Sequence, residues 1–304
     1  MFAFFKSLSA RSERFRFTDM DASFSTRPDY DRLLAQEASY FPQASRSAVE
    51  RLLASSLPSE VQWVAAERPG YPEELYQLEE APDVLIFEGD LSVLSRQVRL
   101  VVAGSRGASE HCQGVTESLC KTLAQHGVAV LSGMVSAVDM AAHHGSLAAQ
   151  CQADTCTVRS CAIVAAPLGA PWPAGRHELG RALYEKGGLL VSLAPQLRGL
   201  AMDESERLER LDFRQRITAA LATAVLVMHV RDGGFTVKLI HEALRLERPV
   251  LIWHEALGQT PSLEIAELLA APPKDAAGRA LVTVVKSLAE IEAAITAWQL
   301  VWWL

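Results

Sequence analysis

Two titratable side chains at helical spacing are the first candidates for chemistry in this sequence. Asp139 and His143 are four residues apart in the segment SGMVSAVDMAAHHGSL. If a helix begins near Ala137, the two side chains share one face, and the carboxylate orients the imidazole by a hydrogen bond. No nucleophile accompanies the pair at a motif-like spacing. We therefore interpret Asp139 and His143 as structural residues that orient a neighbouring site, and we predict no catalytic residue.

Glycine-containing turns supply a second kind of candidate, a site for anions. Three such turns each follow an apolar run and precede a helical pattern, where backbone N–H groups and the helix dipole attract negative charge. The turn residues are Gly104, Ser105, Arg106 and Ser109 in the first, Ser132 and Gly133 in the second, and Gly233, Gly234 and Thr236 in the third. Ser109 and Thr236 are placed to cap the helices that follow. We predict that these turns bind phosphate groups.

Four cations complete the predicted anion site. Arg106 is placed to pair with a phosphate in the first turn, and Lys238 lies within reach of the third. Arg214 and Arg216 add two charges within one predicted helix, for which a solvated helix face is the alternative interpretation. A groove for nucleic acid requires these cations on one face with few acids nearby.

The elements that position these residues alternate along the chain. Short apolar runs predict strands, and helical patterns separate them. Predicted strands span Val84–Phe87, Val128–Leu131, Cys161–Ala166, Leu189–Leu193, Ala224–Val230, Val250–Trp253 and Ala280–Val285. Predicted helices span Arg176–Lys186, Glu204–Leu221, Thr236–Leu246, Pro261–Leu269 and Ala289–Trp298. Such alternation predicts an α/β fold, a doubly wound, mostly parallel sheet with helices on both faces. The turns then meet beyond the carboxyl ends of the strands, where ligands bind in such sheets.

We divide the chain into three parts. Residues 1–28 mix Ser, Arg, Asp and Phe without a period, which predicts a flexible lead. Residues 29–68 fit a small helical preface with two short helices. Residues 69–304 form the large α/β domain. Its Trp-rich end, AITAWQLVWWL, predicts a helix end that packs on the domain, with a partner or dimer contact as the alternative.

Composition narrows the class of protein. Among 304 residues, 36 Asp and Glu against 29 Lys and Arg give a formal net charge of −7, which excludes a wholly basic surface but allows a local basic groove. The five cysteines include no C-x-x-C pair, so we predict reduced thiols, no metal site and no cofactor. No apolar run reaches the roughly 20 residues of a membrane helix, and the N-terminus lacks a signal-peptide core. We expect a cytoplasmic protein that does not enter a membrane.

Taken together, the motifs resemble those of the DNA-processing protein A family (DprA, also called Smf), over roughly residues 70–295. The order of motifs carries the resemblance: a lead-in YP..L..L.D.P..L...G, a VGSR..S turn, the segment SGLARGID..AH..AL, and the helix F-P-x-R-N-R-I-I-A-G-L. The matching positions are Tyr71, Pro72, Leu75, Leu78, Pro82, Leu85 and Gly89, then Gly104, Ser105, Arg106 and Ser109, then Ser132, Gly133, Asp139, Ala142, His143 and Leu147, and last Arg214, Arg216, Ile217, Ala219 and Leu221.

The sequence departs from the family pattern at several site positions. Ser136 and Ala137 stand where the family has an Arg and a second Gly. Gln215 replaces an Asn, and His229 stands where an acidic residue usually ends the strand. Each change removes a cation, a flexible turn or a charge-assisted hydrogen bond worth roughly 1.5–3 kcal/mol. We expect a retained fold with a weakened ligand site, and no C-terminal winged-helix domain of the kind common in the family.

The resemblance implies a Rossmann-like domain in a non-enzymatic protein that binds single-stranded DNA, forms a homodimer and helps to load a RecA-type recombinase during DNA uptake and recombination. A second hypothesis, favoured by the acidic balance and the lost Arg-Gly turn, is a diverged member that acts as a partner-bound scaffold or a nucleotide-sensing module, for example in a defence system. A third is a nucleotide hydrolase, because Gly233-Gly234-Phe235-Thr236 with Glu242 on the next helix is similar to part of the P-G-G-x-G-T turn and helical Glu of such enzymes.

Overall fold

The computed structural model describes residues 61–66, 68–82, 84–149, 159–166, 168, 174–192, 204–231, 233–258 and 261–298. The predicted flexible lead, the two predicted helices of the preface and residues 299–304 of the Trp-rich end lie outside these ranges. What the sequence predicts for these segments stays a prediction.

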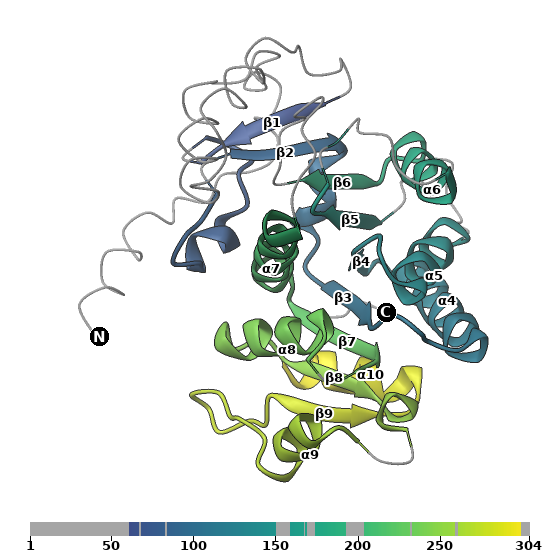
Figure 1. The fold of residues 1–304 in the computed structure, drawn as a ribbon, viewed down its shortest axis with the longest axis vertical. Coiled ribbons are helices and arrows are strands. Elements are labelled where there is room, and N and C mark those ends of the chain that lie inside the picture. Colours follow the sequence, from purple (N-terminus) through teal and green to yellow (C-terminus); the bar gives the residue numbers. More distant parts are fainter. Residues whose placement is uncertain are drawn as a thin grey trace.

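The strands of the described residues form one nine-stranded sheet, in the order β1-β2-β6-β5-β4-β3-β7-β8-β9 (Figure 1). The strands are β1 (Gln62–Ala65), β2 (Val84–Gly89), β3 (Arg99–Gly104), β4 (Ala129–Ser132), β5 (Ser160–Val164), β6 (Leu189–Ser192), β7 (Ala224–His229), β8 (Val250–Trp253) and β9 (Val282–Val285). All neighbours from β6 to β9 are parallel. β2 instead pairs antiparallel with both β1 and β6. The predicted doubly wound, mostly parallel sheet is confirmed.

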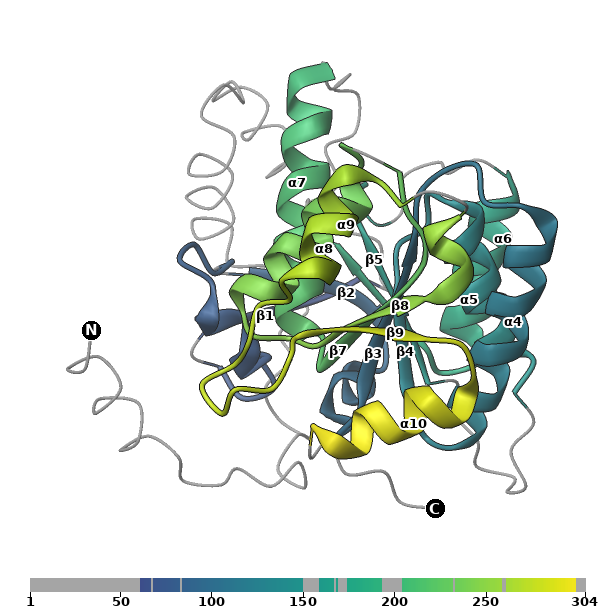
Figure 2. The same cartoon turned by 90° about the horizontal axis from the view of Figure 1, so that it is seen from below.

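Helices cover both faces of this sheet (Figure 2). They are α4 (Glu110–Gln125), α5 (Ala137–Leu147), α6 (Ala174–Glu185), α7 (Glu204–Leu221), α8 (Phe235–Arg245), α9 (Leu263–Ala270) and α10 (Leu288–Ala297), with the 3-10 helices η2 (Glu73–Gln77), η3 (Leu91–Ser95) and η4 (His254–Leu257). α7, α8 and α9 pack on one face, and α4, α5, α6 and α10 pack on the other.

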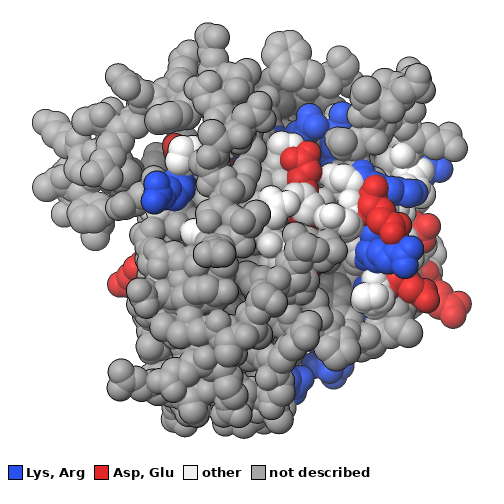
Figure 3. Space-filling view, turned by 90° about the horizontal axis from the view of Figure 1, so that it is seen from above, with Lys and Arg blue, Asp and Glu red and all other residues white. Residues whose placement is uncertain are grey.

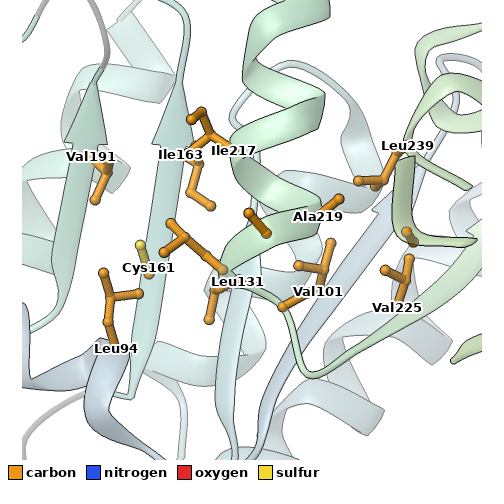
Figure 4. Close-up of a cluster of buried hydrophobic side chains, with 14 of the residues drawn as sticks. Leu94, Val101, Leu131, Cys161, Ile163, Val191, Ile217, Ala219, Val225 and Leu239 are labelled. Carbon is orange, nitrogen blue, oxygen red and sulfur yellow. The ribbon is translucent and has the colours of Figure 1, made fainter. Parts of the chain in front are cut away.

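The central strands are apolar on both sides because both faces are covered. In β3, Val101 and Ala103 belong to the core under α7 and α8. Leu100 and Val102, which alternate with them, belong to the core under α4 and α5. Figure 4 shows the first of these cores, with Ile217 of α7 above the strands. Continuous apolar runs are what parallel strands with two covered faces require.

The predicted strands and helices agree with the structure to within a few residues, and α7 and β8 have the predicted bounds. One element differs: residues 62–65, inside the range predicted as a helical preface, form the strand β1. Four residues carry too little periodicity to reveal a strand. β1 is stabilised by its partner instead, since Trp63 lies opposite Ile86 and Val64 opposite Leu85 of β2.

Candidate functional site

The sheet order changes direction at β3, which has β4 on one side and β7 on the other. The carboxyl ends of these three strands open on one edge, and the turns after them lead into α4, α5 and α8. We call residues 104–109, 132–136 and 233–236 the carboxyl edge. The structure thus brings the three predicted turns together.

Ser105 joins the first turn to the third. Its backbone N–H donates to the carbonyl oxygen of His229 at 2.9 Å, and its hydroxyl donates to Thr236 Oγ1 at 3.0 Å. The same hydroxyl accepts a hydrogen bond from the backbone N–H of Arg231 at 3.1 Å. Ser105 therefore fixes the relative position of two turns, and its side chain is occupied by protein partners.

Capping confirms one predicted helix start and corrects another. Ser109 Oγ accepts from the backbone N–H of Cys112 at 3.2 Å and caps α4, as predicted. The N-cap of α8 is Gly234, which makes no side-chain cap bond, so the prediction that Thr236 caps this helix is wrong. Gly233 has a φ of +61°, which favours glycine, and this bend places the helix start before Thr236. Without a side-chain cap, the first N–H groups of α8 remain available to an anion.

The second turn packs tightly against the first. A Cβ on Gly104 would come within 2.5 Å of Val138 Cγ2 on α5, so glycine is needed for this close approach. The buried Ser132 donates from its hydroxyl to the carbonyl oxygen of Val102 at 2.6 Å. Gly104 and Ser132, both predicted to bind phosphate, therefore make contacts that hold the turns in place.

Asp139 anchors the start of α5. Ser136 is the N-cap, and its hydroxyl oxygen accepts from the backbone N–H of Asp139 at 3.1 Å. Asp139 Oδ2 in turn accepts from the backbone N–H groups of Ser136 at 3.0 Å and of Val135 at 2.9 Å. This reciprocal capping box fixes the second turn and satisfies the buried carboxylate.

His143 is held by partners other than Asp139, so the predicted Asp139–His143 hydrogen bond is wrong. The Nδ1 atom lies 2.8 Å from Ser160 Oγ, and Nε2 lies 2.8 Å from the carbonyl oxygen of Gly133. A neutral ring that donates from Nε2 and accepts at Nδ1 satisfies both contacts. Asp139 and His143 do share one helix face, but the carboxylate binds the backbone N–H groups at the positive end of the α5 dipole instead of the ring. His143 joins the second turn to β5.

Acidification is expected to destabilise the fold through His143. Burial lowers the pKa of this side chain from 6.5 to about 4. The unfolded chain takes up a proton here below about pH 6.5, but the folded protein does so only near pH 4, so the free energy of unfolding falls as the pH drops through this window. The full loss is about 3 kcal/mol, at about 1.4 kcal/mol per unit. Urea unfolding between about pH 7 and pH 4 measures it. His143→Gln cannot titrate and should flatten the profile, and an unchanged profile in that variant would contradict the assignment.

Arg214 is the cation next to the second turn, and it is buried. A Cβ on Gly133 would lie 2.9 Å from Arg214 Nη1 and 2.7 Å from Asp139 Oδ2, so the two charged groups flank this glycine. Within the described ranges, Arg214 Nη1 has no hydrogen-bond partner. Burial lowers the pKa of the guanidinium, and the Asp139 carboxylate opposes that shift. A buried guanidinium N–H without a protein acceptor is suited to an external anion.

Arg216 and Lys238 lie on the solvent side of α7 and α8, away from Arg214. Lys238 Nζ pairs with Asp212 Oδ1 at 2.6 Å, and Arg216 Nη2 lies 3.5 Å from Asp212 Oδ2. Arg216 Nη1 also lies 3.4 Å from Glu80 Oε2. The four predicted cations therefore do not share one face with few acids nearby. Helical geometry explains the difference, because residues two apart on α7 point to different sides of the helix.

Two arginines are exposed at the carboxyl edge. Arg106 lies in the first turn, where Gly107 has a φ of +97°, and Arg231 follows β7. Both are exposed, and neither is in an ion pair of the part of the chain that the structure describes. Arg231 is absent from the predicted site, although a cation directly after a strand that ends at the ligand edge is a signal in the sequence. Arg106, Arg214 and Arg231 are thus the cations that an anion at this edge would meet.

Comparison with known proteins identifies the family. Residues 62–272, more than half of the chain, match the model of the family described as DNA recombination-mediator protein A. The chain belongs to this family. The resemblance seen in the motifs is thereby confirmed.

Curated relatives in the recombination-mediator family match the same core. Protein Smf of Escherichia coli (strain K12) is 28% identical over 204 residues, which is 66% of this chain and 51% of that protein. DNA processing protein DprA of Bacillus subtilis (strain 168) is 22% identical over 200 residues, which is 66% of this chain and 63% of that protein. The matched region therefore spans about half of the first relative and just under two thirds of the second.

Solved structures of the family share the fold. DNA processing protein A from Helicobacter pylori, described with a single-stranded DNA binding mode, superposes with a TM-score of 0.60 at 16% identity and covers 77% of this chain and 96% of its own. DprA from Streptococcus pneumoniae gives a TM-score of 0.63 at 19% identity and covers 83% of this chain and 78% of its own. At these identities the likeness shows the fold.

The departures of this chain from the family pattern have structural consequences. Ser136 supplies the N-cap of α5 where the family has an Arg, and Gln215 is buried on α7. His229 ends β7 with a buried Nδ1 that has no hydrogen-bond partner among the described residues. The expected retention of the fold at these positions is confirmed.

Charge on the described surface of this family member is mixed. Figure 3, a view from above, shows Lys and Arg side chains next to Asp and Glu side chains.

Among the residues described, no group of three or more His, Cys, Asp or Glu side chains is arranged to hold a metal ion. In the same ranges, no helix is long and apolar enough to cross a membrane.

Proposed function

We propose that this chain is a non-enzymatic DNA recombination mediator that binds single-stranded DNA at the carboxyl edge. Family membership and the fold shared with the Helicobacter pylori protein support this proposal. The observation that carries it is local: the exposed Arg106 and Arg231 lie at the first turn and at the end of β7, the buried Arg214 flanks Gly133 of the second turn, and none of the three has an ion-pair partner within the described residues. The uncapped start of α8 adds backbone N–H groups to the same edge.

The residues of the edge divide into two proposed roles. Arg106, Arg214 and Arg231 contact phosphates, while Gly133, Gly233 and Gly234 let the strand approach the backbone closely. A second set holds the turns in position through the contacts described above: Gly104, Ser105, Ser109, Ser132, Thr236, Asp139 and His143.

A hydrolytic role fits the geometry poorly. Glu242 lies eight residues after Gly234, about 12 Å along the axis of α8 from the glycine turn. Its carboxylate pairs with Arg245 at 2.9 Å on the same helix. Glu242 therefore does not face the carboxyl edge, which supports a binding protein over a nucleotide hydrolase.

The wider role follows from the family resemblance. We propose that the protein forms a homodimer, acts in the cytoplasm, and delivers single-stranded DNA to a RecA-type recombinase during recombination or DNA uptake. A dimer would place two carboxyl edges on one strand and increase avidity without any new contact.

A salt titration tests the proposed DNA site. Anisotropy of a labelled oligo-dT should show binding that weakens as salt rises, with a slope of about −0.7 per phosphate contact for a single strand. Arg106→Ala should weaken binding severalfold and reduce the magnitude of that slope by about 0.7. Arg181→Ala on α6, which removes an exposed arginine paired with Glu185, is the matched control and should leave both quantities unchanged. Salt-independent binding, or no binding at micromolar protein, would contradict the proposal.

A nucleotide-sensing module is the second candidate, and one observation favours it. Arg216 and Lys238 are occupied by Asp212 and Glu80, so the cations left at the edge suit one or two phosphates. The same titration separates the two functions. A mononucleotide that competes as well as an equal concentration of oligo-dT nucleotides would favour the sensor, whereas affinity that rises with strand length favours DNA binding.

A further inference from the structure

Asp212 is the centre of an ion-pair cluster on the outer side of α7 and α8. Its two carboxylate oxygens divide between two cations: Oδ1 lies 2.6 Å from Lys238 Nζ, and Oδ2 lies 3.5 Å from Arg216 Nη2. Glu80, which follows η2, holds the other terminal nitrogen of Arg216 at 3.4 Å. We call these four residues the α7–α8 charge cluster. It contains two acids for two cations and is close to neutral as a unit.

Lys238 has a second internal partner. Its ammonium lies 5.3 Å from the ring centroid of Phe235, the first residue of α8, directly after the glycine turn. The contact is within the range of a cation–π interaction. The ammonium of Lys238 therefore makes two internal contacts, an ion pair with Asp212 and a cation–π contact with Phe235. An aromatic face and a cation beside a phosphate-binding turn are the two components with which proteins bind unpaired nucleotides.

All members of the cluster are accessible to solvent. The side chains of Asp212, Arg216 and Lys238 are 32%, 39% and 53% exposed, so water and salt screen their attraction. Exposed pairs of this kind contribute little to stability, and an incoming phosphate can replace the carboxylate. A backbone phosphate offers the same charge and more acceptor oxygens than Asp212 does.

We propose that Asp212 is an internal competitor that withholds Lys238 and Arg216 from the DNA strand. The inference rests on the proposed function, since it concerns the same strand as it leaves the carboxyl edge along α8. In the resting protein the strand meets Arg106, Arg214 and Arg231 alone, and the two cations of the cluster join only when phosphate displaces Asp212. The carboxylate thus sets how many nucleotides are engaged and how steeply binding depends on salt.

Asp212→Asn tests this proposal against a matched variant. Glu242→Gln removes one negative charge from the same helix pair, and Glu242 is also engaged in an ion pair, with Arg245 at 2.9 Å, whereas Asp212 engages two cations. Asp212→Asn should lower the Kd for oligo-dT by about threefold to tenfold. It should also make the salt slope more negative by up to about 1.4, the value for two added single-strand contacts. Glu242→Gln should change the Kd less than about twofold, and Lys238→Ala in the Asp212→Asn background should reverse most of the gain.

The outcomes separate the inference from the function on which it rests. Oligo-dT binding by the wild type together with equal Kd values for Asp212→Asn and Glu242→Gln would overturn the role of Asp212 and leave the DNA site standing. An absence of binding in the wild type and in Asp212→Asn would overturn both. If thermal unfolding shows that Asp212→Asn is misfolded, Glu80→Gln is measured instead. This variant removes one of the two carboxylates that hold Arg216, so it must also lower the Kd for oligo-dT, and failure to do so rejects the proposal.

Discussion

Arg99→Met is expected to lower the free energy of unfolding by about 3–5 kcal/mol, the usual cost of breaking a buried ion pair from one side. Arg99 is 8% exposed at the start of β3. Its Nε donates to the carbonyl oxygen of Leu221 at 2.8 Å, and its Nη1 donates to those of Leu94 at 3.0 Å and Arg96 at 2.9 Å. Its Nη2 pairs with Glu74. One guanidinium therefore satisfies three carbonyls and one carboxylate.

Methionine fills much of the volume of arginine but donates no hydrogen bond, so all four acceptors lose their partner together. Leu221 is the last residue of α7, where unpaired carbonyls and the negative end of the helix dipole add to the cost. Urea unfolding followed by circular dichroism measures the change. Arg181→Met is the control, because that arginine is exposed and pairs only with Glu185 four residues on, and its loss should cost less than about 1 kcal/mol. A similar small cost for Arg99→Met would show that the buried network is not stabilising.

The architecture was accessible from the sequence because each part of it is a local signal. Apolar runs marked the strands, the predicted and observed bounds of α7 coincide at Glu204–Leu221, and Ser109 caps α4 as its position predicts. The convergence of the turns follows from topology once the sheet is parallel, since β3 has neighbours on both sides. Strand β1 was not accessible, because residues 62–65 depend on pairing with β2 and carry no pattern of their own.

The partners of the charged side chains could not be predicted from the sequence in the same way. Lys238 finds Asp212 twenty-six positions earlier in the chain, and this choice depends on how α7 and α8 are rotated against each other. Asp139 had two possible partners, and the backbone N–H groups at the start of α5 took the carboxylate in place of His143. One signal was present: Arg214 falls on the same helix stripe as the buried Ile217 and Leu221, which predicts burial of Arg214 and exposure of Arg216.

Arg214→Met is expected to have the opposite balance of effects to Arg99→Met. Arg214 is also 8% exposed, so the two arginines are equally buried. Yet Nη1 of Arg214 has no hydrogen-bond partner among the described residues, and burial lowers the pKa of its guanidinium. Folding therefore bears the desolvation of this cation with one N–H unpaired, offset by the attraction of the Asp139 carboxylate and not by the three carbonyl bonds that compensate Arg99. Replacement of such a group by an apolar side chain of similar volume should leave the free energy of unfolding unchanged or raise it by about 1 kcal/mol or more.

Arg214→Met should weaken DNA binding although it does not lower the free energy of unfolding. A charge-assisted hydrogen bond is worth roughly 1.5–3 kcal/mol, so loss of the contact between Arg214 and a phosphate should raise the Kd for oligo-dT by about tenfold to about 150-fold. Arg214→Lys keeps the charge without the planar fork and should recover part of the affinity. Anisotropy titrations and urea unfolding on the same preparations measure both quantities.

The Kd for oligo-dT and the free energy of unfolding together distinguish a ligand-binding arginine from a structural one. If Arg214 only packs against Gly133 and Asp139, its replacement should destabilise the protein and affect DNA binding indirectly. Arg214→Met and Arg214→Lys would then lower the free energy of unfolding and the affinity for oligo-dT in parallel. A residue retained for its ligand gives a variant that is as stable as the wild type, or more stable, and that no longer binds. If Arg214→Met instead destabilises the protein as strongly as Arg99→Met and leaves the Kd of the folded fraction unchanged, Arg214 is a structural residue and the phosphate site must be built from Arg106 and Arg231 alone.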